Sequence, residues 1–166
     1  MVQPINHHFD AYLRVEEDSG IKHELCAGRV RARAGGSPDH ARINANITSL
    51  LGAQLAGKPC AVFSSDLRIG VPATELVTYP DVSIVCGSLE RDPIDLTGHT
   101  VVNPKVLIEV LSPSTADYDR GEKLVHYKQL PSLEAIVLLD HAAQRSAPSS
   151  GSAPGPSGAG ASTRSS

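Results

Sequence analysis

Three carboxylates stand at positions where a folded chain needs a chemical reason to keep them. Glu109 interrupts the apolar run 106–111, and a carboxylate inside a buried strand is costly unless it is paired or bound to a metal. Asp81 lies at the mouth of the apolar run 82–85, and Glu24 lies at the start of an earlier strand-like segment. We therefore predict that the three acids converge on one site. The alternative is that Glu109 pairs with a buried Lys or Arg, Asp81 caps a turn and Glu24 faces water.

A lysine accompanies these acids. Asp119 and Lys123 are four residues apart in a predicted helix, so they share one helical face, which continues to Tyr127. Lys123 follows the Glu109 strand closely enough to extend back over the end of the sheet. Two or three carboxylates and one lysine suit metal-dependent hydrolysis of a phosphodiester, because carboxylates bind magnesium and a cation stabilises the charge of the transition state. The alternative for Lys123 is a surface ion pair with Asp119, worth under about 1 kcal/mol.

The elements that must position these side chains follow from the spacing of the apolar residues. The first predicted helix, with Phe9, Tyr12 and Leu13 on its inner face, ends at Gly20. The order of helices and strands contains no internal repeat, which favours an α/β fold of the mixed α+β kind, with helices flanking a central mixed sheet. The predicted helices cover residues 6–18, 39–56 and 117–130, and the predicted strands cover 24–34, 61–63, 67–71, 82–85, 106–111 and, as a last buried strand, 135–139.

The composition changes sharply after residue 140. Of the 26 residues from 141 to 166, 21 are Ser, Ala, Gly or Pro, and no Ile, Leu, Val, Met or aromatic residue occurs after Leu139. Such a segment buries too little apolar surface to offset the entropy lost on ordering. We predict a folded domain over residues 1–140 and a disordered tail over 141–166. The sheet edge left after Leu139 is expected to be exposed and open to pairing with another chain.

Composition also excludes several classes of protein. The 15 Lys and Arg and 18 Asp and Glu give a formal charge of -3, which argues against a histone-like nucleic-acid binder but not against a local basic face. No apolar run approaches the roughly 18 residues of a membrane span, and residues 1–10 lack the apolar stretch of a signal peptide, so we expect a soluble cytoplasmic protein. Cys26, Cys60 and Cys86 are odd in number and far apart, which favours buried free thiols over disulfides or a metal site.

Basic residues concentrate in the first half of the chain. Residues 22–68 hold seven basic and three acidic residues, and Arg29, Arg31 and Arg33 alternate along one predicted strand, so they point to one face. This face is a candidate phosphate-binding surface; the alternative is a solvated sheet face, because no aromatic residue lies between the arginines for base stacking. His40 is a further candidate site residue, with a structural role as its alternative. No metal-ligand spacing occurs among His7, His8, His99 and His126.

A series of motifs covers the chain from about residue 9 to residue 140. In order they are Lys22-His23-Glu24-Leu25, Gly28, His40, Ser65-Asp66-Leu67-Arg68, Tyr79-Pro80-Asp81-Val82, Ile108-Glu109-Val110-Leu111-Ser112-Pro113-Ser114-Thr115, Asp119-Arg120-Gly121-Glu122-Lys123 and Tyr127. These motifs closely resemble those of the Uma family of restriction-endonuclease-like proteins, a branch of the PD-(D/E)xK nuclease superfamily. The resemblance implies a restriction-endonuclease-like fold and a divalent metal, magnesium or manganese. It also implies Asp81, Glu109, Val110 and Glu24 as the metal site and Lys123 as the catalytic lysine.

The chain departs from the pattern of these nucleases at three places. In the superfamily pattern the lysine lies two residues after the acid, where this chain has Leu111, and Lys123 on the next helix resembles a relocated substitute. The family usually has an acid before Gly28, where this chain has Ala27. The family's sheet also continues past the equivalent of Asp140 with further strands, whereas this chain continues into Ser, Gly, Pro and Ala.

The residues and the resemblance together predict a magnesium-dependent, endonuclease-like phosphodiesterase. Its substrate is expected to be nucleic acid, in the first place DNA, with Asp81 and Glu109 holding the metal and Lys123 stabilising charge or orienting the attacking water. A homodimer is a further expectation. The alternative is a non-catalytic DNA-binding or assembly module on the same fold. A purely structural protein would leave the buried Glu109 unexplained.

Overall fold

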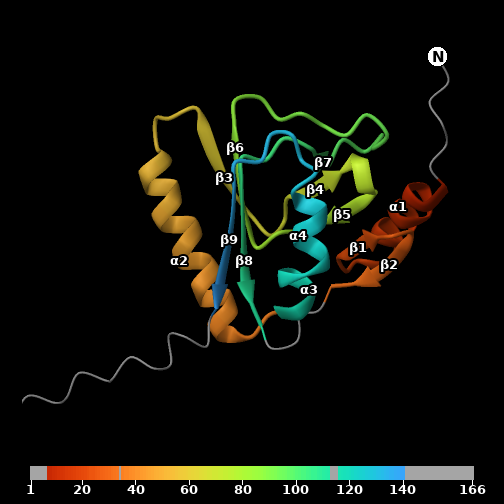
Figure 1. Ribbon diagram of the computed structural model, residues 1–166, viewed down its shortest axis with the longest axis horizontal. Helices are drawn as coiled ribbons and strands as arrows, with labels where there is room; N and C mark the ends of the chain where they lie inside the picture. The colour runs from red at the N-terminus through yellow and green to blue at the C-terminus, as the bar shows by residue number, and fades with distance from the viewer. Residues whose placement is uncertain (1–6, 34, 113–115, 141–166) are drawn as a thin grey trace, which may run out of the picture.

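The computed structural model describes residues 7–33, 35–112 and 116–140, which form helices and strands in a mixed order (Figure 1). The predicted tail and the Pro113-Ser114-Thr115 motif lie outside the described residues. The helices are α1 (His7–Ser19), α2 (Pro38–Leu55), the 3-10 helix η1 (Pro72–Thr74), α3 (Ala116–Arg120) and α4 (Glu122–Tyr127). The strands are β1 (His23–Cys26), β2 (Arg29–Ala32), β3 (Cys60–Ser64), β4 (Arg68–Val71), β5 (Leu76–Thr78), β6 (Val82–Cys86), β7 (Thr100–Val101), β8 (Val106–Leu111) and β9 (Ala135–Asp140).

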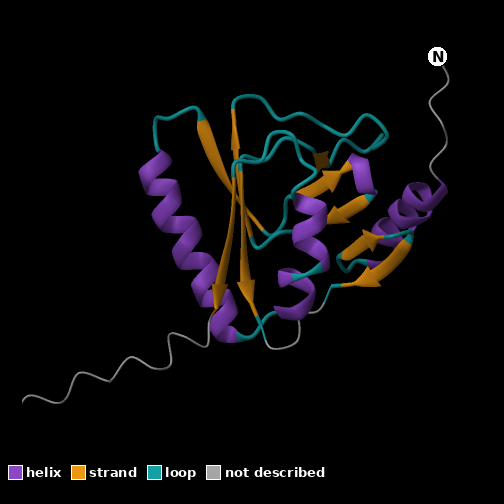
Figure 2. Ribbon diagram, in the orientation of Figure 1, coloured by secondary structure: helices purple, strands orange, loops and turns teal. Residues whose placement is uncertain are grey.

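The strands form two mixed sheets (Figure 2). One sheet has the order β2-β1-β5-β4-β7, with β4 and β7 parallel, and the other has the order β3-β6-β8-β9, with β8 and β9 parallel. In Figure 1 the four-stranded sheet stands between α2 on one side and α3 and α4 on the other, while α1 covers the five-stranded sheet from outside. The predicted fold class, a mixed sheet structure flanked by helices, is confirmed, although the strands divide between two sheets.

The strand predicted over 24–34 is wrong as a single element, because the chain reverses in its middle. Ala27 and Gly28 both adopt positive φ, 49° and 73°. Two consecutive residues of this kind make the tight turn that matches the twist of an antiparallel hairpin. β1 and β2 therefore pair with each other, and Glu24 lies opposite Arg31. The hairpin carries the first predicted acid on one strand and the first arginines on the other.

The helix predicted over 117–130 is also divided. Gly121 has φ -105° and ψ -97°, which are not helical angles, and it separates α3 from α4. A Cβ atom at this position would lie 2.9 Å from the carbonyl oxygen of Asp117, so only glycine fits without a shift. Asp119 and Lys123 still face each other across the break, with Oδ1 and Nζ 3.5 Å apart.

The core forms where the sheets meet the helices. Phe9 and Tyr12 of α1 are 2% and 0% exposed and pack with Leu25, which confirms the predicted inner face of the first helix. A second cluster joins the two sheets to α4 through residues such as Leu107 and Tyr127, both 0% exposed. Because Tyr127 is anchored there, α4 holds its neighbouring Lys123 against the same end of β8.

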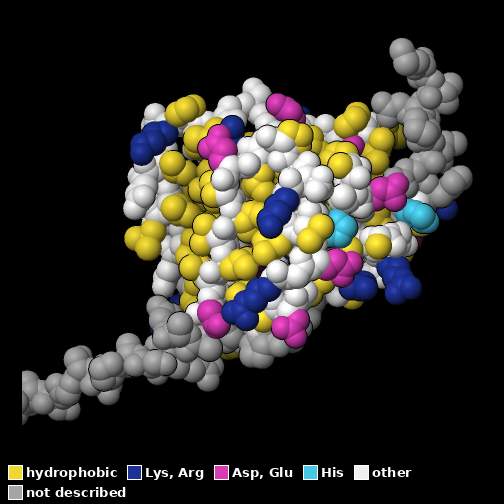
Figure 3. All heavy atoms as spheres, viewed as in Figure 1, with side chains coloured by type: hydrophobic (Ala, Val, Ile, Leu, Met, Phe, Trp, Pro, Cys, Tyr) yellow, Lys and Arg dark blue, Asp and Glu magenta, His cyan; other side chains and the backbone are white. Residues whose placement is uncertain are grey.

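The strand predicted over 135–139 forms as β9, but the prediction that it is buried is wrong. β9 is an edge strand whose side chains are only partly covered or exposed, and Val137 is 36% exposed. None of the side chains of α2 is fully buried, and Leu50 is 65% exposed. Figure 3 shows hydrophobic side chains gathered on the side of the molecule where β9 and α2 lie. β9 thus forms an edge of the four-stranded sheet within the described part of the chain.

Two of the three cysteines do not fit the prediction of free thiols. Cys60 in β3 and Cys86 in β6 lie directly opposite each other in an antiparallel ladder, with Cα atoms 3.9 Å apart, and they form a disulfide. Their separation of 26 positions in the sequence conceals this pairing, which only the register of β3 and β6 creates. Cys26 is a buried free thiol, as predicted. Among the described residues, no helix has the length and apolar character needed to cross a membrane.

Candidate active site

Two neighbouring strands bring Asp81 and Glu109 to the same end of a sheet. Asp81 directly precedes β6, and β6 pairs with β8 so that Val82 lies opposite Ile108. The backbone N–H of Val110 donates a hydrogen bond to Asp81 Oδ2 at 2.8 Å, which fixes the carboxylate beside the strand that carries Glu109. Asp81 is 3% exposed and Glu109 is 2% exposed, so each needs partners inside the protein.

Asp81 binds two further side chains from separate elements. Arg33 Nη2 donates to Oδ1 at 2.8 Å, and His40 Nε2 lies 3.0 Å from Oδ2. Arg33 directly follows β2, and His40 lies in the first turn of α2, where its backbone N–H donates to the side chain of the N-cap residue Ser37. The carboxylate therefore joins the hairpin, α2 and β8 instead of capping a turn. His40 faces the site.

Glu109 is paired with a cation from the chain itself. Lys123 Nζ lies 2.8 Å from Glu109 Oε1, and the Tyr127 hydroxyl donates to the same oxygen at 2.5 Å. Burial raises the pKa of the Glu109 carboxyl, and the opposing charge of Lys123 does not cancel this effect. The alternative of a buried ion pair at Glu109 is thus observed. Its cationic partner is the same lysine that the resemblance identifies as catalytic.

Lys123 is surrounded by three carboxylates. Its Nζ lies 3.6 Å from Glu24 Oε1 and 3.5 Å from Asp119 Oδ1, in addition to its contact with Glu109. The alternative of a surface ion pair is wrong, since Lys123 is 3% exposed and Asp119 is 6% exposed. Burial acts to lower the pKa of Lys123, but the three negative charges outweigh burial and raise that pKa above its ordinary value. The ammonium group therefore remains protonated at neutral pH.

The buried cluster retains an excess of negative charge. Four carboxylates face two permanent cations, which gives a formal charge of about -2 when His40 is neutral. The carboxylates are Asp81, Glu109, Glu24 and Asp119, and the cations are Lys123 and Arg33. Glu24 is further held by the Thr78 hydroxyl, which donates to its Oε1 at 2.5 Å. An uncompensated negative charge in a buried site favours the binding of a cation.

A cavity of about 1110 Å³ opens over this cluster. The candidate residues from the sequence that line it are Glu24, Arg31, Arg33, His40, Asp81, Glu109, Val110 and Lys123. Arg29, predicted with the other arginines, is exposed on β2 but is not part of the cavity wall. The cavity thus brings together acids, one buried lysine and part of the predicted basic face, although these come from distant parts of the sequence.

Asn44 is a cavity residue that the sequence did not single out. It lies one turn after His40 on α2, and its Oδ1 is buried without a hydrogen-bond partner among the described residues. A buried acceptor of this kind is costly unless a water or a ligand binds it. One sequence signal indicates Asn44: it lies four residues after His40, and residues four apart share one face of a helix.

A divalent metal fits this site through the chemistry of its donors. Carboxylate oxygens are the ligands that magnesium and manganese prefer, and the cluster carries the charge that a divalent ion balances. Lys123 and Tyr127 both bind Oε1 of Glu109, and no hydrogen bond to its Oε2 occurs within the described part of the chain. Among the described residues, the ligand oxygens of Glu24, Asp81 and Glu109 do not all lie within 4.8 Å of one another.

Comparison with known proteins bears on the family and on the fold. A family model described as "Putative restriction endonuclease" matches residues 9–148. Two uncharacterized proteins of Synechocystis sp. (strain ATCC 27184 / PCC 6803 / Kazusa) are similar: slr1290 is 36% identical over 78% of this chain, and sll1609 is 33% identical over 78% of this chain. The matched region spans 66% of the first relative's length and 72% of the second's.

A solved structure shares the fold. It is a crystal structure from Anabaena variabilis ATCC 29413 described as a putative nuclease belonging to DUF820. It matches with a TM-score of 0.63 and 20% sequence identity, over 82% of this chain and 74% of that chain. The likeness shows that the two chains share a fold. The chain belongs to the Uma2 family of restriction-endonuclease-like proteins.

Proposed function

We propose that the cavity over Asp81 and Glu109 is the active site of a metal-dependent endonuclease that hydrolyses phosphodiester bonds in nucleic acid. The observation that carries this proposal is the position of Lys123. A buried lysine with three carboxylates within 3.6 Å is an expensive arrangement for stability alone. In phosphodiester hydrolysis the carboxylates can hold a metal ion, and the lysine can stabilise the negative charge of the transition state.

The proposed roles follow from the contacts of each residue. Asp81, Glu109 and the backbone carbonyl of Val110 would hold a magnesium or manganese ion, with Glu24 as a further acid. When bound, such an ion supplies Lewis acidity toward a phosphate oxygen and lowers the pKa of a water ligand. Lys123 stabilises the negative charge on the phosphate or orients the attacking water.

Other cavity residues would position these groups. Arg33 and His40 hold the Asp81 carboxylate in place through both of its oxygens. Arg31 is exposed at the cavity wall, where its guanidinium can bind a phosphate of the substrate backbone. Contacts to backbone phosphates do not select a sequence, and we expect DNA as the first substrate to test.

A second candidate function is a non-catalytic nucleic-acid-binding or assembly module. The observation that favours it is the saturation of Asp81, whose two oxygens already accept bonds from Arg33, His40 and Val110. These contacts satisfy both oxygens of the buried Asp81 carboxylate, so it needs no metal ion as a partner. In either case we expect β9, an edge strand among the described residues, to support a homodimer, which sedimentation of the full chain would detect.

Cleavage of supercoiled plasmid DNA separates the two candidates. We expect the purified chain to nick or linearise plasmid with magnesium or manganese and to be inactive with EDTA. Asp81→Asn should abolish cleavage, because it removes a metal-binding charge. Asp117→Asn is the matched control, since Asp117 is an exposed acid of α3 outside the cavity wall. Retention of plasmid by an inactive wild-type chain in a gel-shift assay would favour the non-catalytic module.

A further inference from the structure

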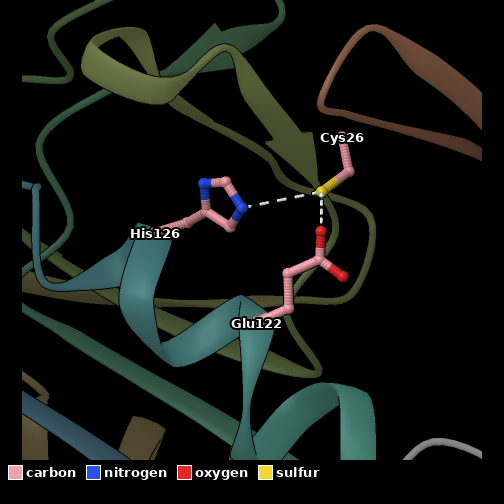
Figure 4. A group of neighbouring side chains, drawn as sticks. All are labelled: Cys26, Glu122 and His126. Atoms are coloured by element: carbon pink, nitrogen blue, oxygen red, sulfur yellow. Dashed lines mark hydrogen bonds between the residues drawn. The ribbon is translucent and has the colours of Figure 1, made fainter.

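A second group of metal-ligating side chains lies beside the proposed active site. Cys26 ends β1, while Glu122 and His126 lie four residues apart on α4 and share one face of that helix. Figure 4 shows the three side chains pointing toward one another, with the cysteine sulfur between the carboxylate and the imidazole. Sγ lies 3.3 Å from Glu122 Oε1 and 3.6 Å from His126 Nε2. His126 thus meets potential ligands other than the histidines, from which the sequence predicts no ligand spacing.

Both distances from the Cys26 sulfur match the geometry of a tetrahedral zinc site. Zinc binds sulfur, nitrogen and oxygen at about 2.0–2.3 Å, so two ligands of one tetrahedron lie roughly 3.3–3.8 Å apart. Both contacts of Cys26 Sγ fall within this interval, and all three ligand atoms lie within 4.8 Å of one another. The Glu122 and His126 ligand atoms lie farther apart than this interval, so an ion at the centre would draw these two side chains together by up to about 1 Å.

The chemistry of the three ligands selects the kind of metal. One thiolate and one imidazole favour zinc or cobalt over magnesium, which prefers oxygen ligands alone. A thiolate and a carboxylate also balance the charge of a divalent ion, so the occupied site would be neutral. This matters because Cys26 is 2% exposed and a net charge there would be costly.

We propose that Cys26, Glu122 and His126 form a zinc-binding site, with a water in the fourth position. The ion would tie α4 to the β1–β2 hairpin. α4 carries Lys123, and the hairpin carries Glu24, so the site would fix the distance between two groups of the cavity that Cys26 also lines. This proposal does not depend on nuclease activity, because its ligands are different from those of the carboxylate cluster.

The surroundings of His126 indicate how tightly the ion would be held. With Nε2 as the ligand, the ring proton lies on Nδ1, which is buried and has no hydrogen-bond partner among the residues the structure describes. Histidine ligands usually donate this second N–H to an acceptor, and loss of such a partner typically weakens binding about 10- to 100-fold. We therefore expect reversible binding that a strong chelator removes.

Cobalt substitution tests the proposal directly. The full-length chain is stripped of metal without reductant, so that the Cys60–Cys86 disulfide stays closed and Cys26 is the remaining thiol. Titration with cobalt(II) should produce a thiolate-to-cobalt charge-transfer band that saturates at one ion per chain, and zinc should displace it. Cys26→Ser should abolish the band, and His126→Gln should weaken cobalt binding at least about 10-fold.

Two controls assign the signal. His99→Gln removes an exposed imidazole outside the cluster, and Asp117→Asn removes an exposed acid outside it; both should leave the titration unchanged. Absence of the charge-transfer band in the wild-type chain would overturn the zinc site, and so would a band that survives Cys26→Ser. If Cys26→Ser fails to fold, His126→Gln decides, because unchanged cobalt affinity in that variant also overturns the site. Failure of plasmid cleavage would leave these outcomes unaffected.

Discussion

Replacing Lys123 with methionine should destabilise the chain strongly, because it removes the cation at the centre of the acid cluster. At an effective dielectric constant of about 20, the attraction of Nζ is about 6 kcal/mol toward Glu109 at 2.8 Å and about 5 kcal/mol toward each of Asp119 and Glu24. The desolvation of the buried groups offsets much of this attraction. The loss of one partner from a buried pair typically costs about 3–5 kcal/mol.

The assay is thermal unfolding of wild type, Lys123→Met and a matched control at pH 7. We expect the Tm of Lys123→Met to fall by roughly 10 °C or more, since each 1 kcal/mol shifts a chain of this size by about 2–4 °C. Lys128→Met is the control, because Lys128 is exposed at the end of α4, and its Tm should stay close to that of wild type. An equal Tm for Lys123→Met and wild type would refute the electrostatic reasoning.

The destabilisation should also depend on pH in a defined direction. Burial already raises the pKa of Glu109 above its ordinary 4.5, and loss of the lysine charge raises it further. The folded variant then binds a proton that the unfolded chain releases, so its stability falls as pH rises through the folded pKa. The Tm deficit of Lys123→Met should therefore be smaller at pH 5.5 than at pH 8. Adding Glu109→Gln to the variant should recover part of the loss.

Three further predictions concern the metal, the disulfide and the tail. Manganese should raise the Tm of wild type but not of Asp81→Asn; equal stabilisation of both would count against the proposed metal site. Replacing Cys60 and Cys86 with serine together should lower the free energy of unfolding by about 2–4 kcal/mol, measured by urea denaturation without reductant, and an unchanged midpoint would show that the cross-link contributes nothing. Deleting residues 141–166 should leave the Tm unchanged within error, whereas a clear fall would show that the tail packs on the domain.

Much of the candidate site could be predicted because its residues break a local pattern. Glu109 is conspicuous within an apolar strand, and Asp81 stands at the start of another. The register of β6 and β8 then brings the two together, as expected for neighbouring strands. The spacing from Asp119 indicates Lys123 as a candidate. Its burial is not predictable from the sequence, because a charged helix face usually points to solvent.

The sequence was less informative where tertiary structure decides between local alternatives. Alternation through residues 24–34 suggested one strand, but the positive φ of Ala27 and Gly28 makes a hairpin, and Ala-Gly is a weaker turn signal than Asn-Gly. Gly121 lies inside a helical pattern that tolerates one glycine, so the break between α3 and α4 was not evident. Proximity of Cys26 to His126 requires the packing of α4 against β1, which no periodicity encodes.

Cleavage of plasmid DNA by Glu109→Gln is the most direct measurement of the proposed nuclease site. This variant removes a metal-binding charge while its amide oxygen can still accept hydrogen bonds from Lys123 and Tyr127, and thermal unfolding verifies that it folds. We predict that the wild-type chain cleaves plasmid with magnesium or manganese and that Glu109→Gln is at least about 100-fold slower under the same conditions. Equal cleavage rates for a folded Glu109→Gln and wild type, or no cleavage of DNA or RNA by wild type with either metal, would contradict a nuclease centred on Asp81, Glu109 and Lys123.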